Sequence, residues 1–206
     1  IRMITGTIRQ LDRLIKIRPE REPGRITGTA LALSGQISLS AICFRYANRS
    51  DLTIKGISLD IKAGEFITIT GPSGAGKSTL LKIMLGLYQS QSGSVRFDDL
   101  DLRQVDPAEL RQRLGFLGQD PAFFYGTIAQ NLRLAAADST DAELLTALKN
   151  VGINVNDPIL LEGMETRLNA ANRRAMSLSF IQRLAIARTF LSEDPVILLA
   201  EPANHL

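Results

Sequence analysis

Hydrophobic and polar residues follow two patterns along the first half of this chain. One face of a helix is formed by Ile4, Ile8, Leu11 and Ile15, and Pro19 and Pro23-Gly24 end that helix. Residues 37–40 and 57–61 alternate between apolar and polar positions, which predicts two strands. A third strand is predicted over residues 65–70, directly before a glycine-rich loop.

Helical spacing dominates the second half. Helices are predicted over residues 78–87, 127–134, 141–150 and 179–190, and another begins at Pro107 with Asp106 as its N-cap. A short strand is predicted over residues 95–97. Val196-Ile197-Leu198-Leu199 is apolar at every position, as expected for a buried parallel strand. Strands separated by helices in this way predict an α/β fold.

The composition is that of a folded domain. The chain has 206 residues, 45% of them hydrophobic, and a net charge of +3, which excludes a disordered protein. One cysteine, Cys43, excludes a disulfide scaffold, and its place at the end of an apolar pattern favours a core residue. No apolar run approaches the ~18 residues that a membrane-spanning helix needs.

The positive charge lies at the N-terminus. Residues 1–25 carry seven basic and three acidic side chains, whereas the remainder carries 17 basic and 18 acidic ones. A nucleic-acid-binding face across the domain is therefore not indicated. The basic helix has two interpretations: a solvated helix packed on the domain, or the cytoplasmic end of a membrane helix, where basic residues collect.

The strongest chemical signal is the glycine-rich loop, which matches G-x-x-x-x-G-K-[ST] (Walker A) in full. Its small residues let backbone N–H groups surround a phosphate, and the helix that starts near Lys77 directs its positive end at the same anion. Lys77 supplies an ammonium for the β- and γ-phosphates, and Ser78 offers a hydroxyl to Mg²⁺. The motif predicts a nucleoside triphosphate site without separating ATPases, GTPases and kinases. The predicted phosphate-binding residues are Gly71, Ser73, Gly74, Ala75, Gly76, Lys77, Ser78 and Thr79.

Three further segments accompany the loop in a fixed order. Phe44-Arg45-Tyr46 precedes it, residues 119–132 follow it, and residues 183–188 (R-L-A-I-A-R) come shortly before the last apolar strand. Together they resemble the nucleotide-binding domain of ATP-binding cassette (ABC) transporters, from about residue 13 to residue 206. The 119–132 stretch is most similar to the exporter type, in which membrane and nucleotide-binding domains share one chain, as in type I secretion and multidrug exporters.

The resemblance implies a fold and a domain plan. The fold is a RecA-like P-loop NTPase core with an antiparallel β subdomain and a helical subdomain at about residues 121–190, truncated at its C-terminal end. Residues 1–25 would be a basic helix and linker from a membrane domain, and residues 26–206 the nucleotide-binding domain.

The resemblance also implies roles for individual residues. Tyr46 resembles the aromatic residue that stacks on adenine, and Gln119 the glutamine that contacts Mg²⁺ and relays the nucleotide state. A core tyrosine and a polar loop residue are the alternatives. Glu201 resembles the general base, and a carboxylate at the end of a parallel strand suits that work. The implied catalytic residues are Glu201, Lys77 and Gln119, and the implied Mg²⁺ ligands are Ser78 and Gln119.

Two departures from the family pattern predict impaired catalysis. The family has aspartate before the catalytic glutamate, where this chain has Ala200, so an anchor for Mg²⁺ is missing. The family signature L-S-G-G-Q is replaced by Met176-Ser177-Leu178-Ser179-Phe180. Its glycines let backbone N–H groups approach the partner's γ-phosphate, and Leu178 and Phe180 are expected to place bulk there. His205 is expected to be a surface loop residue.

The implied partners are a transmembrane domain, in the same polypeptide, and a second nucleotide-binding domain, as a homodimer or a heterodimer. The implied location is the cytoplasmic face of the inner or plasma membrane, with no nucleic-acid partner. Two functions stay open: an exporter domain that binds and hydrolyses ATP with Mg²⁺, or a non-catalytic nucleotide-binding or structural pseudo-domain. A third, a soluble ABC protein of translation or DNA repair, is suggested by the similarity of residues 201–206 to E-P-T-N-H-L. The 119–132 stretch and the basic N-terminal helix oppose it.

Overall fold

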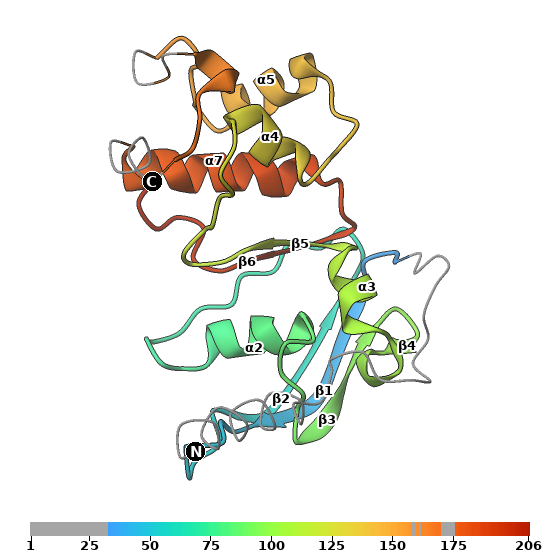
Figure 1. Cartoon of the computed structure of the whole chain (residues 1–206). Coiled ribbons are helices and arrows are strands. Elements are labelled where there is room, and N and C mark those ends of the chain that lie inside the picture. The colour runs from blue at the N-terminus through green and yellow to red at the C-terminus, as the bar shows by residue number, and fades with distance from the viewer. Residues whose placement is uncertain (1–32, 158–159, 161, 170–175) are drawn as a thin grey trace, which may run out of the picture.

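The protein is described by a computed structural model over residues 33–157, 160, 162–169 and 176–206 (Figure 1). The helix and linker predicted over residues 1–25 lie outside these residues. An antiparallel sheet with α2 forms one half of the molecule, and α4, α5 and α7 form the other (Figure 1). The parallel pair β5–β6 lies between the halves. Within the described ranges, no helix has the length and apolar character needed to cross a membrane.

The antiparallel sheet has the strand order β2-β1-β3-β4. Its strands are β1 (Ile37–Phe44), β2 (Ile54–Ile61), β3 (Ser92–Phe97) and β4 (Leu100–Asp101), followed by the 3-10 helix η1 (Leu102–Gln104). The strands predicted over residues 37–40, 57–61 and 95–97 are confirmed, and each is longer than predicted. Cys43 is half-buried on β1.

Helix α2 (Lys77–Met84) packs its apolar side on this sheet, in one hydrophobic core. The helix was predicted to reach residue 87 but ends earlier, because Gly86 adopts a left-handed φ of +69°. The Gly86 N–H then donates to the Ile83 carbonyl, and the Leu87 N–H to the Lys82 carbonyl. These two bonds form the Schellman arrangement that terminates helices.

A β-bulge lets β1 bury larger apolar side chains than strict alternation would. The register of β1 shifts after Ser40 on the β3 side, and Ala41 has a φ of +45°. The side chains before the bulge (Ile37, Leu39) and after it (Ile42, Phe44) are therefore all buried. One extra residue shifts the phase of a strand in this way.

Gly93 lies directly against this bulge, and we expect Gly93→Ala to destabilise the fold. An added Cβ would lie 2.3 Å from the Ser40 carbonyl oxygen and 2.5 Å from that of Ala41, at a φ of +83°. Backbone atoms on a paired strand cannot move aside, so the free energy of unfolding should fall by roughly 2–3 kcal/mol or more. Urea denaturation measures the change. Gly56→Ala is the matched control, because Gly56 has a φ of +66° in open space. Equal losses for both variants would contradict the role of the bulge contact.

The parallel pair consists of β5 (Leu114–Leu117) and β6 (Val196–Leu199), with Leu114 opposite Val196. The strand predicted over residues 196–199 is confirmed. Helix α3 (Pro107–Arg111) precedes β5 and begins as predicted, since the Asp106 carboxylate accepts from the Ala108 N–H over 2.8 Å. Both strands direct their C-terminal ends, and the residues that follow them, toward the same edge.

The strand predicted over residues 65–70 is absent from the structure. This segment connects β2 to α2 without pairing to a strand of the described chain (Figure 1). Phe66 is 86% exposed, and Ile67 and Ile69 are also exposed. The physical reason is that strand structure depends on a partner backbone, and in the described part of the chain β6 pairs with β5 alone.

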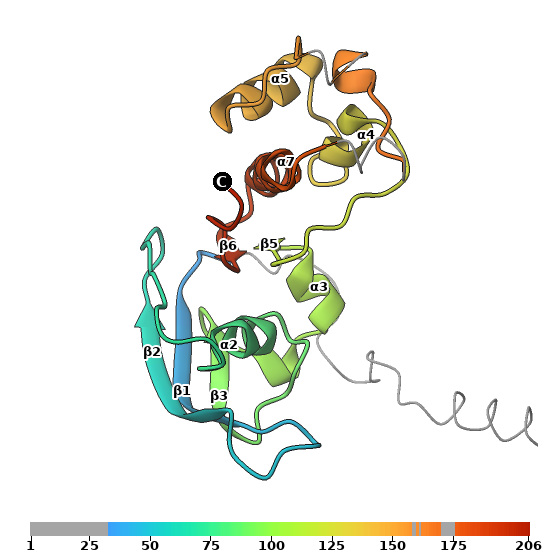
Figure 2. The same cartoon turned by 90° about the vertical axis from the view of Figure 1, so that its left-hand side faces the viewer.

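Among the described residues of the helical half, the helices are α4 (Ile128–Arg133), α5 (Asp141–Asn150) and α7 (Leu178–Leu191), with the short 3-10 helix η2 (Gly163–Glu165). All three predicted helices are confirmed. Capping boxes begin α4 and α5: Thr127 pairs with Gln130 at the start of α4, and Thr140 pairs with Glu143 at the start of α5. Figure 2 shows α7 between the other helices and the β5–β6 pair. A second hydrophobic core joins these helices.

Candidate functional site

A cavity of about 240 Å³ brings together residues from distant parts of the chain. One wall comes from the β1–β2 connection, a second from the glycine-rich loop and the first turn of α2, and a third from the residues after β5 and β6. The lining residues are Tyr46, Arg49, Thr53, Ser73, Gly74, Gly76, Lys77, Ser78, Thr79, Gln119 and Glu201. Most of the predicted site residues meet here, and Gly71 and Ala75 belong to the same loop without lining the cavity. No sequence motif pointed to Arg49 or Thr53.

The loop has the backbone geometry of an anion cradle. Gly74 and Gly76 adopt φ values of +80° and +95°. A Cβ on Gly76 would lie 2.7 Å from Ile54 Cδ1 and 3.0 Å from the Thr53 carbonyl oxygen, so this position requires glycine for space as well as for φ. Gly76 is the N-cap of α2, no side chain caps the helix there, and its first turn carries no acid. The N-terminal amides therefore fit a phosphate.

Lys77 is held against this loop. Its Nζ donates to the carbonyl of Gly71 over 2.8 Å and to that of Pro72 over 3.0 Å. The ammonium therefore lies over the loop instead of extending into solvent. With the helix N-terminus, it makes this the positive end of the cavity.

Tyr46 lines the cavity and also belongs to the core. Its hydroxyl shares a hydrogen bond of 2.9 Å with Thr79 Oγ1. Its ring lies edge-on to Phe44, at 5.0 Å, and to Tyr88, at 5.4 Å. Thr79 is buried on the first turn of α2, so this hydrogen bond fixes the Tyr46 hydroxyl. The half-buried tyrosine packs against the core and lines the cavity, and adenine stacking stays a prediction.

Gln119 is exposed just after β5, in a loop anchored by a buried asparagine. Asn131 on α4 is 1% exposed. Its Oδ1 accepts from the Phe124 N–H over 2.8 Å, and its Nδ2 donates to the carbonyls of Phe124 and Thr127 over 3.0 and 2.9 Å. Arg188 also donates to the Ala122 carbonyl over 3.0 Å. Sequence reasoning missed Asn131, although a polar residue on the apolar side of a predicted helix was a signal for it.

We expect Asn131→Ala to destabilise the domain and free the loop that carries Gln119. The change removes three hydrogen bonds and leaves the Phe124 amide without its partner, so the free energy of unfolding should fall by roughly 2–3 kcal/mol. Chemical denaturation measures the loss. Asn150→Ala, at the exposed end of α5, is the control. A result for Asn131→Ala within error of that control would show that the anchor contributes nothing.

The residues after β6 supply one carboxylate to the cavity. Ala200 is buried, and its N–H donates to the Leu117 carbonyl over 2.8 Å. It places a methyl group at the position where the family pattern has an aspartate. Glu201 carries the only carboxylate among the described lining residues. The described chain contains no cluster of three or more His, Cys, Asp or Glu suited to a metal. The oxygens of Ser78 and Gln119 line this cavity and fit a Mg²⁺ ion that takes most of its ligands from phosphate and water.

The signature segment begins α7, and one expectation about it is wrong. Ser177 is the N-cap, and its hydroxyl oxygen accepts from the Phe180 N–H over 3.0 Å. Phe180 is 6% exposed and packs into the helical core, because the N-terminal turn of α7 directs it inward. It therefore adds no bulk at the helix end. Leu178, 64% exposed, does add bulk there. His205 is exposed, as predicted.

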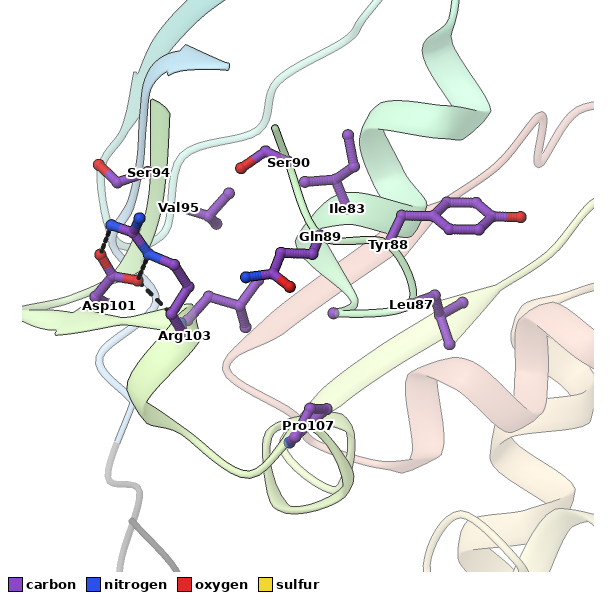
Figure 3. Close-up of a pocket in the computed structure, with 12 residues that line it drawn as sticks. Ile83, Leu87, Tyr88, Gln89, Ser90, Ser94, Val95, Asp101, Arg103 and Pro107 are labelled. Carbon is purple, nitrogen blue, oxygen red and sulfur yellow. Dashed lines mark hydrogen bonds and ion pairs between the residues drawn. The ribbon is translucent and has the colours of Figure 1, made fainter. Parts of the chain in front are cut away.

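Another cavity, of about 260 Å³, lies between the C-terminal end of α2 and the β3–β4 hairpin (Figure 3). Its charged groups are Asp101 and Arg103, which form a two-point contact with distances of 3.0 and 2.6 Å. This contact holds the pKa of Asp101 below its ordinary value. The cavity contains none of the predicted site residues, and its charges satisfy each other.

Comparison with known proteins gives a consistent result. The profile of the family described as "ABC transporter" matches residues 54–204. ATP-binding cassette sub-family B member 6 of Mesocricetus auratus is 38% identical over 84% of this chain and 20% of its own length. The glutathione/L-cysteine transport system protein CydC of Escherichia coli is 36% identical over 87% of the chain and 31% of its own length. This chain therefore spans a fifth to a third of these relatives.

Solved structures agree. A bacterial Atm1-family ABC exporter with ATP bound superimposes with a TM-score of 0.83 at 28% identity, over 100% of this chain and 36% of its own chain. The predicted fold, a P-loop NTPase domain with an antiparallel β region and a helical region, is confirmed by this match and by the family profile.

Proposed function

Because the chain belongs to the ABC transporter family, we propose that it is the ATP-binding, energy-coupling domain of an exporter, in which ATP hydrolysis drives transport across a membrane. One observation carries this proposal: the cavity in which the phosphate loop, Tyr46, Gln119 and Glu201 meet. Domains of this family bind ATP, generally with Mg²⁺. The permease and exporter names of the relatives support this function over a role in translation or DNA repair.

The lining residues suggest how the site works. The amides of the loop and the Lys77 ammonium would hold the phosphates, and the Tyr46 side of the cavity would receive the base. Glu201 would accept a proton from the water that attacks the γ-phosphorus. The bond from that phosphorus to the bridging oxygen then breaks, and its electron pair leaves with ADP. Ser78 and Gln119 would hold Mg²⁺, which neutralises phosphate charge when bound.

The remaining assignments follow from the same proposal. Residues 26–206 are the nucleotide-binding domain, with a helical subdomain at about residues 121–190, and residues 1–25 lead from a membrane domain in the same polypeptide. A second nucleotide-binding domain completes the site, at the cytoplasmic face of the membrane. The names of the relatives support this plan, since they include ATP-binding/permease proteins that are much longer than this chain.

A second function is favoured by two particular residues. Ala200 leaves β6 without a second acid, and the exposed Leu178 occupies the N-terminus of α7. Both changes would slow hydrolysis while leaving the phosphate loop intact. A domain with these features could bind ATP to set the geometry of a complex without hydrolysing it.

Phosphate release by the complete protein separates these functions. We expect Mg²⁺-dependent release from ATP that exceeds the release by Glu201→Gln, with equal ATP affinity in the two proteins by calorimetry. Release equal to that of Glu201→Gln, with ATP bound, would favour the non-catalytic domain. Failure to bind ATP at all would overturn both functions.

A further inference from the structure

The Glu201 carboxylate receives a hydrogen bond from a neighbouring amide. Asn204 Nδ2 donates to Glu201 Oε2 over 2.7 Å. The same two residues close a backbone turn, since the Asn204 N–H donates to the Glu201 carbonyl over 3.1 Å. Glu201 is exposed and has a long, flexible side chain, so this contact restricts a carboxylate that would otherwise sample many orientations.

The turn is attached to the body of the protein on two sides. Gln182 on α7 is 1% exposed, and its Nε2 donates to the Pro202 carbonyl over 3.2 Å. Ala200, one residue before Glu201, donates its N–H to the Leu117 carbonyl on β5. Glu201 itself has a φ of +52°, a conformation that non-glycine residues rarely adopt. These anchors hold the turn in that conformation.

We propose that Asn204 is a positioning residue that aims the Glu201 carboxylate into the cavity, on a turn that Gln182 fixes to α7. This inference rests on the proposed role of Glu201 as the base. A donor on Oε2 leaves Oε1 to accept the proton of the attacking water, so one oxygen is held and the other reacts. Asn204 itself touches neither the water nor the nucleotide in this scheme.

A simple turn-forming role for Asn204 makes the opposite prediction for one variant. Aspartate has the same size and shape as asparagine and is favoured in turns, so Asn204→Asp would preserve a turn. It would also replace the donor by a second carboxylate beside Glu201, which repels it. Asn204→Asp should therefore be the most damaging variant if the residue aims Glu201, and the mildest if it only forms the turn.

The kinetic test uses the complete protein. We expect Asn204→Ala to lower kcat by roughly 10-fold to 100-fold, because small misplacements of a reacting group have effects of this size. ATP affinity by calorimetry should stay within about twofold, and Asn204→Asp should lose more than Asn204→Ala. Asn150→Ala and Asn150→Asp are matched controls on the exposed end of α5. Wild-type kcat in Asn204→Asp would overturn the inference.

A second measurement does not depend on activity. In the full chain labelled with ¹⁵N at asparagine, the hydrogen-bonded side-chain proton of Asn204 should resonate downfield of its geminal partner. Because the two protons of a primary amide are inequivalent in any case, the effect to measure is the additional downfield shift: Glu201→Ala should move the Asn204 proton upfield, whereas Gln119→Ala should leave it unchanged. An Asn204 signal unaffected by Glu201→Ala would overturn the inference, whatever the kinetics. If the complete protein releases no phosphate above Glu201→Gln, the proposed hydrolysis fails, and this signal alone decides whether Asn204 holds Glu201.

Discussion

Replacing Lys77 by alanine is expected to weaken ATP binding by roughly 10-fold to 100-fold and to reduce phosphate release to background. The ammonium is held over the loop by the carbonyls of Gly71 and Pro72, at the same end of the cavity as the N-terminus of α2. Lys77 is the only lysine among the residues that line the cavity in the described chain. Its removal should therefore leave the phosphates with backbone amides as their main donors.

Calorimetric titration of the complete protein measures the affinity. Lys149→Ala is the matched control, since Lys149 lies exposed on α5, away from the cavity. Thermal denaturation without nucleotide shows that both variants fold. If Lys77→Ala bound ATP as tightly as Lys149→Ala, the cavity would not be the nucleotide site.

Replacing Ala200 by aspartate is expected to make ATP affinity strongly dependent on Mg²⁺. In the wild-type protein we expect measurable but weak binding with little metal dependence, because the lining residues offer few oxygen ligands. An aspartate at position 200, directly after β6, would add a charged oxygen ligand beside Glu201. If the absence of an acid at position 200 limits hydrolysis, phosphate release by Ala200→Asp should exceed that of the wild-type protein by roughly 10²-fold.

Titration with and without Mg²⁺ measures the effect on affinity separately from turnover. Ala200→Asn keeps the size of aspartate without its charge and should gain little. Because Ala200 is buried, both variants should lose some stability. Comparing their ATP affinities with each other therefore separates the effect of the charge from the effect of the lost stability. A strong Mg²⁺ dependence already present in the wild-type protein would show that Ala200 is not a defect.

The elements predicted most accurately are those whose signals are local. Helix α5 and strand β6 have the bounds expected from the sequence. A capping box starts the helix at Thr140, and a continuous apolar run defines the strand. Likewise, α3 begins at Pro107 because Asp106 caps it. In each case the residues that decide the structure lie within a few positions of it.

Elements that depend on distant partners were predicted poorly. Residues 65–70 have a strand pattern, yet no strand of the described chain pairs with them. The bulge at Ala41 is decided by the facing strand, where Gly93 makes room for it. Phe180 points into the helical core although its position in the signature suggested a place at the helix end. Local pattern carries no information about which backbone lies opposite.

The same distinction between local signals and tertiary contacts applies to the candidate site. The sequence alone determined the phosphate loop, because its glycines, Lys77 and Ser78 are contiguous and their chemistry depends on local backbone geometry. Tyr46, Gln119 and Glu201 were expected at this loop through the family resemblance, and the tertiary structure brings them together there. Only the tertiary structure decided that Asn131 anchors the Gln119 loop and that Asn204 holds the Glu201 carboxylate. These contacts depend on how α4, α7 and the β5–β6 pair pack, and packing is a property of the whole chain.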